Sequence, residues 1–101
     1  MYLILWEFEV AAERRDEFCA IYAAGGDWAQ LFAQAPGYLG TDLLASCEDP
    51  ARFLTVDRWT SAEHFADFQR NFHDTYAALD ARCQGLTLSE SRLGAFISSQ
   101  D

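Results

Sequence analysis

The segment 52–59, RFLTVDRW, places a carboxylate and an indole on the same face of a predicted strand. Because strand side chains alternate between faces, Phe53, Thr55, Asp57 and Trp59 lie together. If helices cover this face, Asp57 loses solvation and its pKa rises toward the range of a general base. Such a base could remove a proton from a molecule bound beside it. The alternatives are a salt bridge to a neighbouring arginine or a solvent-facing strand end.

Aromatic residues could form the walls of a pocket around this carboxylate. Trp59 stands at the end of the strand, where the chain enters a helix, and it is either ordinary core packing or a pocket wall. Trp6, on the first predicted strand, would flank the same cavity. We expect Trp28 and Tyr76, from two predicted helices, to complete the lining.

The two histidines are candidates for proton transfer or for metal binding. His64 and His73 lie nine residues apart on one predicted helix, about 13 Å along its axis and on opposite sides of its apolar stripe. They cannot share an ion within that helix, and no Cys-His cluster or HxxxH spacing accompanies them. We therefore predict no metal site. His73 adjoins Phe72 and Tyr76, so it is the better candidate for moving a proton, with a surface position as the alternative.

The glycine pair before Trp28 gives a second region of interest. Gly25-Gly26-Asp27-Trp28 lacks the lysine and the glycine spacing of a phosphate-binding loop. It could act as a hinged lid over the cavity, with Trp28 as apolar cover, or simply as a break between helices. Asp27 is the expected N-cap of the short helix that follows.

Alternating and helical hydrophobic patterns define the elements that position these residues. Strands are predicted over 2–10, 38–47, 52–59 and 86–98, the last with a bulge between Ser89 and Gly94. Helices are predicted over 11–24, over a short segment from Asp27, and over 60–85, where Thr60 and Glu63 form a capping box. One apolar stripe should run along the last helix, through Phe65, Phe68, Phe72, Tyr76, Leu79 and Cys83.

The resulting order, β-α-β-β-α-β, predicts an α+β, ferredoxin-like domain over residues 1–101. Right-handed crossovers would give a four-stranded antiparallel sheet with two helices on one face. The other face would carry Leu3, Leu5, Leu54 and Val56, which is too apolar to leave in water. We expect a homodimer through that face. Glu7 and Glu9 lie on it, and arginines there should form salt bridges with them.

Composition limits the classes of partner. The chain has 101 residues, half of them hydrophobic, and a net charge of −9. This charge opposes binding to nucleic acids or to anionic membranes. The widely spaced Cys19, Cys47 and Cys83 fit reduced thiols, and no signal peptide is apparent, so we expect a cytoplasmic protein.

With these motifs, the chain resembles the antibiotic biosynthesis monooxygenase family of dimeric α/β barrels. The similarity covers nearly the whole sequence, through the aromatic first strand, PGYLGTDLL at 36–44 and FLTVDRWTSAEHFADF at 53–68. It is closest to bacterial members with a GDW element, here 26–28. The resemblance implies a pocket between sheet and helices. It also implies, as in the quinone-forming members, oxidation of aromatic molecules by dioxygen without a cofactor.

The family's site residues are only partly present. In the quinone-forming members a strand-end tryptophan, a preceding asparagine and a following tyrosine bind substrate or handle protons; Trp59 matches the first, while Thr55 and Phe65 occupy the other two positions. We expect Phe65 to line the pocket. Relatives that degrade haem use an asparagine, a tryptophan and a histidine where this chain has Trp6, Phe68 and Ala78. Haem is therefore not expected, and no other cofactor is implied.

Three hypotheses follow. The first is a cofactor-independent monooxygenase for an aromatic or polyketide-like molecule, with Asp57 or His73 moving the proton. The second is a non-catalytic dimer that binds a small hydrophobic ligand. In the third, the aromatic side chains fill their own cavity and no ligand enters.

Overall fold

The computed structural model describes residues 1–99. Its elements follow the predicted β-α-β-β-α-β order, and the predicted break before Asp27 is present, but the predicted helix over 60–85 is divided into two. In chain order they are β1 Tyr2–Glu9, the 3₁₀ helix η1 Ala12–Arg14, α1 Arg15–Tyr22, α2 Asp27–Phe32, β2 Tyr38–Ala45, β3 Arg52–Trp59, α3 Ala62–Asn71, α4 His73–Arg82 and β4 Ser89–Ile97. The ferredoxin-like α+β prediction is thereby confirmed.

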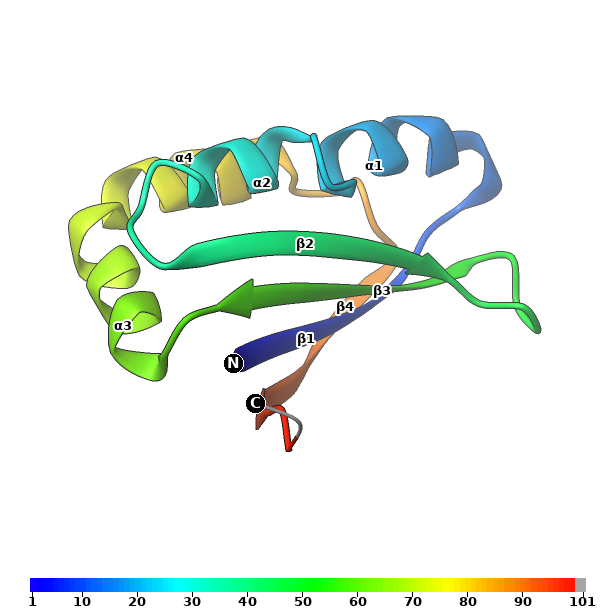
Figure 1. Cartoon of the computed structure of the whole chain (residues 1–101). Coiled ribbons are helices and arrows are strands. Elements are labelled where there is room, and N and C mark those ends of the chain that lie inside the picture. The colour runs from blue at the N-terminus through cyan, green and yellow to red at the C-terminus, as the bar shows by residue number, and fades with distance from the viewer. Residues whose placement is uncertain (100–101) are drawn as a thin grey trace.

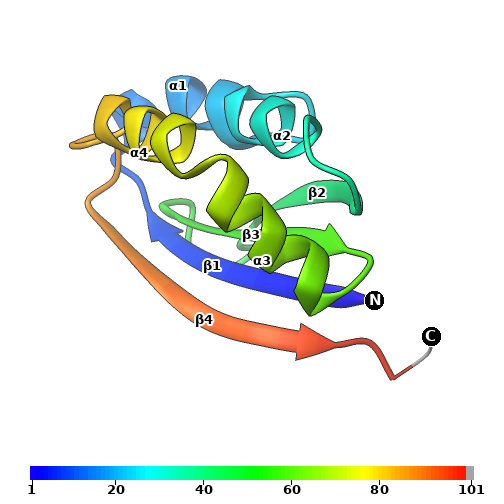
Figure 2. The same cartoon turned by 90° about the vertical axis from the view of Figure 1, so that its left-hand side faces the viewer.

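The four strands form one antiparallel sheet in the order β2-β3-β1-β4. The two central strands pair along their whole length, from Tyr2 opposite Trp59 to Glu9 opposite Arg52. All the helices lie on one side of this sheet, and the opposite face is bare (Figures 1 and 2). This is the predicted two-layer arrangement.

The core lies between the sheet and the helices. Ile4 and Phe8 from β1 and Phe53 and Trp59 from β3 are all buried, as the alternation of these strands predicts. Buried side chains that meet them from the helices are Phe18, Tyr22, Trp28, Leu31, Phe32, Phe68 and Leu79. Many of these are rings, and they pack in tilted and edge-to-face pairs.

The expected bulge in the last strand is present. Leu5 of β1 lies opposite Gly94, but the next residue, Trp6, lies opposite Arg92, so Leu93 is the extra residue on β4. This shift places Glu90 and Arg92 on the helix-covered side of the sheet, opposite Phe8 and Trp6.

The predicted helix over 60–85 is broken at Phe72. The backbone there leaves the helical region, with φ −121° and ψ 21°, so α3 ends and α4 begins in a new direction (Figure 2). Phe72 stacks on Phe68, with ring centroids 5.4 Å apart, and packs against the core. The predicted stripe is therefore not continuous: Phe68, Leu79 and Cys83 are buried, while Tyr76 is 37% exposed.

Two predicted helix caps are wrong by one residue. The N-cap of α3 is Ser61, whose hydroxyl accepts from the His64 N–H at 3.2 Å. Thr60 instead donates through Oγ1 to the Gly37 carbonyl, 2.9 Å away. The N-cap of α2 is Gly26 rather than Asp27. Position 26 has no room for a side chain, because a Cβ there would lie 2.3 Å from the Ile21 carbonyl oxygen.

Candidate active site

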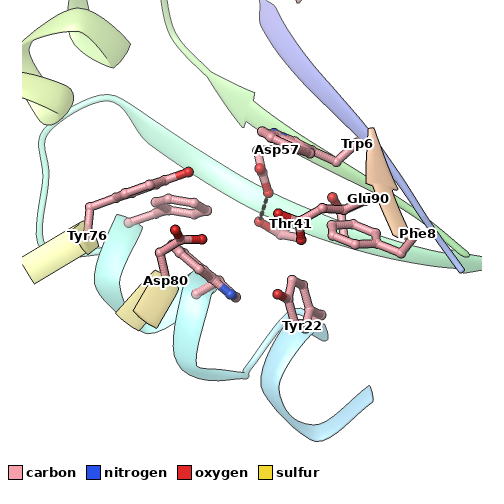
Figure 3. Close-up of a pocket in the computed structure, with 11 residues that line it drawn as sticks. Trp6, Phe8, Tyr22, Thr41, Asp57, Tyr76, Asp80 and Glu90 are labelled. Carbon is pink, nitrogen blue, oxygen red and sulfur yellow. Dashed lines mark hydrogen bonds between the residues drawn. The ribbon is translucent and has the colours of Figure 1, made fainter. Parts of the chain in front are cut away.

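A cavity opens between the central strands and the helices. Its walls are mostly aromatic, and it is lined by Trp6, Phe8, Tyr22, Trp28, Phe32, Thr41, Thr55, Asp57, Tyr76, Asp80 and Glu90 (Figure 3). The cavity has a volume of about 60 Å³ and is open to solvent at its mouth. Since one water needs about 10–15 Å³, the cavity has room for several waters. The aromatic side chains therefore do not fill the space between the layers.

Asp57 provides the buried carboxylate of this cavity. It projects from β3 and is only 8% exposed. Oδ1 accepts a hydrogen bond from Thr41 Oγ1 at 2.7 Å. The nearby arginine, Arg58, points to the other face of the sheet and binds Asp42 instead. Burial raises the pKa of Asp57 from 3.8 to about 6, despite the opposing effects of the Thr41 hydroxyl and the Arg58 charge.

The hydrogen bond to Asp57 continues outward through a second hydroxyl. Tyr38 Oη lies 2.6 Å from Thr41 Oγ1. Because Thr41 uses its single hydroxyl hydrogen toward Asp57, the tyrosine must be the donor in this contact. Tyr38, Thr41 and Asp57 thus form a directed chain of hydrogen bonds that ends on the carboxylate.

Three of the predicted aromatic residues line the cavity with Asp57. Trp6 comes from β1, Trp28 from α2 and Tyr76 from α4. The Trp28 and Tyr76 rings contact each other, with centroids 5.0 Å apart. Sequence segments that lie far apart therefore meet at one pocket, as the hypothesis required.

The structure does not bring Trp59 or Phe65 to the cavity. Trp59 is 0% exposed and packs among the rings of Phe32, Tyr38, Phe65 and Phe68. It belongs to the core where β3 leads to α3, which is the alternative considered for it above. Phe65 packs against Trp59 and Tyr2, also outside the lining.

His73 also lies away from the pocket. Its side chain is 80% exposed and contacts only Asp74, at 3.3 Å from Nδ1. The break at Phe72 explains this position, because His73 begins α4 instead of continuing α3. His64 bonds Ser61 at the start of α3. Neither imidazole can reach the Asp57 carboxylate, so Asp57 is the proton-transfer candidate within the cavity.

Six lining residues were not anticipated: Phe8, Tyr22, Phe32, Thr41, Asp80 and Glu90. Thr41 faces Asp57 across the β2–β3 pairing, so its role follows only once the register of the two strands is known. Asp80 and Glu90 come from α4 and β4, and neither belongs to a motif that sequence reasoning would single out. Desolvation, followed by the charge of Asp80, raises the pKa of Glu90.

The charged groups of the lining are all acidic. Asp57, Asp80 and Glu90 lie among aromatic rings, and no arginine or lysine lines the pocket. Burial raises the pKa of the Tyr76 hydroxyl, and these three carboxylates raise it further. Among residues 1–99, no three His, Cys, Asp or Glu side chains gather closely enough to hold a metal ion.

The Gly-Gly-Asp-Trp segment, residues 25–28, has two structural roles. Gly26 allows α1 and α2 to meet closely, and Asp27 accepts from Arg82 of α4 at 3.4 Å. Trp28 is 8% exposed and forms part of the cavity wall. The segment therefore breaks the helix and also delivers an indole to the site.

Together, the two-layer fold and the aromatic cavity with a buried carboxylate define a small α+β protein with a cavity between sheet and helices. The chain belongs to the antibiotic biosynthesis monooxygenase family, whose model matches residues 1–78. This confirms the resemblance read from the sequence. No curated protein matches the chain closely enough to add to this assignment.

Solved structures support the same fold. A mutant of SnoaB, a cofactor-independent oxygenase from Streptomyces nogalater, is 22% identical, with a TM-score of 0.67 and coverage of 99% of this chain and 94% of that one. A protein from Deinococcus radiodurans, described as an antibiotic biosynthesis monooxygenase, is 16% identical, with a TM-score of 0.74. The match covers 100% of this chain and 95% of that one. A mutant of MhuD, solved with two manganese protoporphyrin IX molecules per active site, is 24% identical, with a TM-score of 0.68. The match covers 100% of this chain and 97% of that one.

Proposed function

We propose that the protein is a cofactor-independent monooxygenase that oxidises a small aromatic molecule, with Asp57 as the general base. The observation that carries this proposal is the Asp57 carboxylate: it is buried at an aromatic cavity, it has no arginine partner, and its pKa is raised to about 6. A base with that pKa is ionised at neutral pH and still accepts a proton readily. Membership of the monooxygenase family supports the reaction type.

The chemistry requires only the substrate, dioxygen and this carboxylate. Asp57 removes a proton from an acidic O–H or C–H of the aromatic substrate and leaves an anion. The anion gives electrons to dioxygen, and a C–O bond forms to yield a hydroperoxide. The hydroperoxide O–O bond then breaks with loss of water, leaving a quinone. For an anthrone, one dioxygen supplies one oxygen atom to the quinone and one to the water.

The cavity limits the size of the substrate. Its volume of about 60 Å³ is well below the roughly 300–1,000 Å³ of sites for drug-sized ligands. An aromatic ligand would therefore insert at most one ring and leave the remainder in the open mouth. A porphyrin does not fit this description, and no histidine lines the cavity as an axial ligand.

Oxygen consumption with a panel of anthrones and naphthols tests this proposal. We expect uptake with at least one compound, and a loss of at least a hundredfold in Asp57→Asn, because the amide cannot accept the proton. Asp74→Asn, at an exposed carboxylate of α4, is the matched control and should retain activity. If the panel binds but no oxygen is consumed, the protein is the non-catalytic ligand-binding dimer of the second hypothesis.

We also propose that the protein is a homodimer through the bare face of the sheet. Leu3, Leu5, Leu54 and Val56 lie there, half-buried, next to the exposed Leu44 and Phe96. Two ion pairs within the protomer, Glu7 with Arg52 and Asp42 with Arg58, neutralise most of the charge on this face, and Glu9 at the end of β1 is exposed. The face is therefore largely apolar, and a second copy could cover it with little charge repulsion.

A cytoplasmic location belongs to the proposal as well. It is supported by three cysteines, Cys19, Cys47 and Cys83, that form no disulfide with one another. Within the described residues, no helix is long and apolar enough to cross a bilayer. The net charge of −9 continues to argue against nucleic-acid partners.

A further inference from the structure

Asp80 and Glu90 belong to two neighbouring cavities. Both residues line the aromatic cavity that also contains Asp57. Both also line a second cavity of about 200 Å³, formed by the end of α4, the following loop and the start of β4. The other residues of its lining are mostly small or polar: Cys83, Gln84, Gly85, Thr87, Leu88 and Ser89. A ligand that begins in the aromatic cavity can therefore extend past these two carboxylates into polar surroundings.

Neither of these carboxylates has a positive partner. Within residues 1–99, no arginine or histidine pairs with Asp80 or Glu90, and no hydrogen bond reaches either carboxylate. The Gln84 side chain donates to the backbone carbonyl of Asp80 instead. Desolvation, followed by the charge of Asp80, raises the pKa of Glu90, so the two negative charges act on each other. Two like charges without a counter-ion attract a cation that enters between them.

The negative charges of the aromatic cavity act on one point of its wall. Burial is the main cause of the raised pKa of the Tyr76 hydroxyl, and all three carboxylates of the lining add to it. Arg92 opposes them, but it lines neither cavity. The carboxylates therefore converge on the same space, and the charged groups around that space are acidic.

One oxygen of the buried carboxylate also faces this space without a partner. Asp57 is only 8% exposed, and its Oδ1 accepts from Thr41. Within the described residues, Oδ2 accepts no hydrogen bond, yet it is not fully enclosed by the protein. Because Asp57 lines the aromatic cavity, the accessible surface of Oδ2 lies there. Buried acceptors are nearly always paired, so this oxygen points to a donor that arrives with a ligand.

Aromatic rings give a cation a second source of attraction in the same place. Asp80 follows Tyr76 by one turn of α4, and Figure 3 shows both side chains on the cavity side of that helix. The Tyr76 ring contacts the Trp28 ring, with centroids 5.0 Å apart. An ammonium group at Asp80 is thereby close to two electron-rich rings, whose faces attract cations.

A positive charge on the ligand also favours the proposed reaction. Removal of a proton by Asp57 leaves an anion in a cavity whose charged side chains are all carboxylates. That anion is opposed by Asp80 and Glu90. A cation carried by the substrate itself offsets this repulsion and needs no arginine or lysine from the protein.

We propose that the substrate is an arylalkylamine, whose ring enters the aromatic cavity beside Asp57 and whose protonated amino group lies between Asp80 and Glu90. This inference rests on the proposed function and narrows its substrate class. The amino group keeps its proton and forms no covalent bond, so it binds and orients the molecule. Any polar extension beyond the amine occupies the second cavity.

Three phenols of similar shape test the charge preference. Tyramine is a cation at pH 7, 4-ethylphenol is neutral, and 3-(4-hydroxyphenyl)propionate is an anion. Isothermal titration calorimetry measures their affinities for the wild-type protein. We expect tyramine to bind about tenfold more tightly than 4-ethylphenol, and the propionate to bind most weakly. Equal affinities for the three, or failure of tyramine to bind, would overturn the inference.

Paired substitutions locate the amino group. Asp80→Asn combined with Glu90→Gln removes both charges and keeps the size of the side chains. The affinity for tyramine should fall about tenfold, to that of 4-ethylphenol. The affinity for 4-ethylphenol should stay unchanged, which also shows that the cavity is intact.

A control pair separates a local effect from the net charge of the protein. Glu13→Gln combined with Asp74→Asn removes two exposed carboxylates outside both cavities, and the tyramine preference should remain. Loss of the preference in this control would assign it to net charge. A preference that survives neutralisation of Asp80 and Glu90, or that only Asp57→Asn removes, would overturn the placement of the amine.

Failure of the proposed function gives a different result. In that case the wild-type protein consumes no oxygen with any aromatic compound, while the tyramine preference still depends on Asp80 and Glu90. An enzyme that consumes oxygen with neutral aromatics, and binds tyramine no better than 4-ethylphenol, would reject the amine and retain the proposed function.

Discussion

At the scale of single residues, the Asp57 carboxylate links catalysis to stability. Its pKa rises from 3.8 to about 6 because folding removes water from it. A carboxyl group with a higher pKa in the folded state holds its proton more tightly there than in the unfolded chain. Its contribution to stability is thus complete below about pH 3.8 and is lost as the pH rises through about 6. The protein tolerates this cost at neutral pH in order to keep a base in an aromatic cavity.

Asp57→Asn should therefore stabilise the protein at neutral pH while removing activity. The amide oxygen can still accept from Thr41, and the desolvated charge is gone. We expect a gain on the order of 2–3 kcal/mol in the free energy of unfolding at pH 7, shrinking toward zero near pH 4. Urea unfolding at several pH values measures this. A variant less stable than wild type at pH 7 would contradict the origin given for the pKa.

Thr41 lowers the pKa of the Asp57 carboxylate, whereas burial raises it. Its hydroxyl bonds Asp57 at 2.7 Å and lowers the pKa against the effect of burial. Thr41→Val keeps the shape and removes this bond, so the acid limb of the kcat/KM profile should move upward by about one pH unit. Tyr38→Phe, which removes the outer hydroxyl of the chain, should give a smaller shift in the same direction. An unchanged profile in Thr41→Val would argue that Asp57 is not the group that titrates.

The sequence predicts some of these residues and not others, for physical reasons. Alternation along a strand assigns the face of Asp57, and covering helices imply its burial. The same alternation cannot tell that Asp57 lines the cavity while Trp59 is buried in the core, because both side chains share that face. Only the packing of α3 separates the core from the cavity. Asp80 and Glu90 reach the pocket through the positions of α4 and of the β4 bulge. Those positions are set by tertiary structure.

At the scale of elements, the turn between α2 and β2 holds α3 in position. The Gly37 carbonyl accepts from the Thr60 N–H at 2.8 Å and from Thr60 Oγ1 at 2.9 Å. Gly37 has φ +90°, and a Cβ there would lie 2.4 Å from the His64 ring. The start of α3 thus rests directly on a backbone position that only glycine can occupy.

Gly37→Ala should accordingly destabilise the fold by about 2–4 kcal/mol, from left-handed strain together with the clash. Two other glycines separate these causes. Gly85 has φ +80° but nothing within 4 Å of a Cβ, so Gly85→Ala should cost only about 1 kcal/mol. Gly25 has neither feature, and Gly25→Ala should be neutral or slightly stabilising. Thermal unfolding of the three variants gives the ranking, and an equal effect at positions 37 and 85 would remove the clash from the explanation.

The break between α3 and α4 shows where prediction of elements ends. The apolar stripe from Phe65 to Cys83 keeps helical spacing throughout, and no glycine or proline interrupts it. The chain nevertheless bends at Phe72, whose ring stacks on Phe68 and packs against the core. Periodicity reports which residues face inward, but the direction of a helix depends on what it packs against. Beyond this bend, His73 is exposed and Asp80 lines the cavity.

At the scale of the whole molecule, the two faces of the sheet serve different purposes. The helix-covered face carries the cavity, and the bare face carries a largely apolar surface with two ion pairs, Glu7–Arg52 and Asp42–Arg58. Strand alternation predicts this division from β1 and β3 alone. A stable association requires about 800 Å² from each partner, which a four-stranded sheet face can supply.

Leu5 lies near the middle of this bare face, on central strand β1, and Leu5→Glu tests the proposed dimer. A symmetric interface would bring the new carboxylate close to its own copy, and both charges would be buried without a counter-ion. We expect sedimentation to show a dimer for wild type and a monomer for the variant. Ala78→Glu, on the exposed surface of α4, adds the same charge elsewhere and should remain dimeric. Circular dichroism confirms that each variant is folded, and a folded Leu5→Glu that stays dimeric would place the interface on another surface.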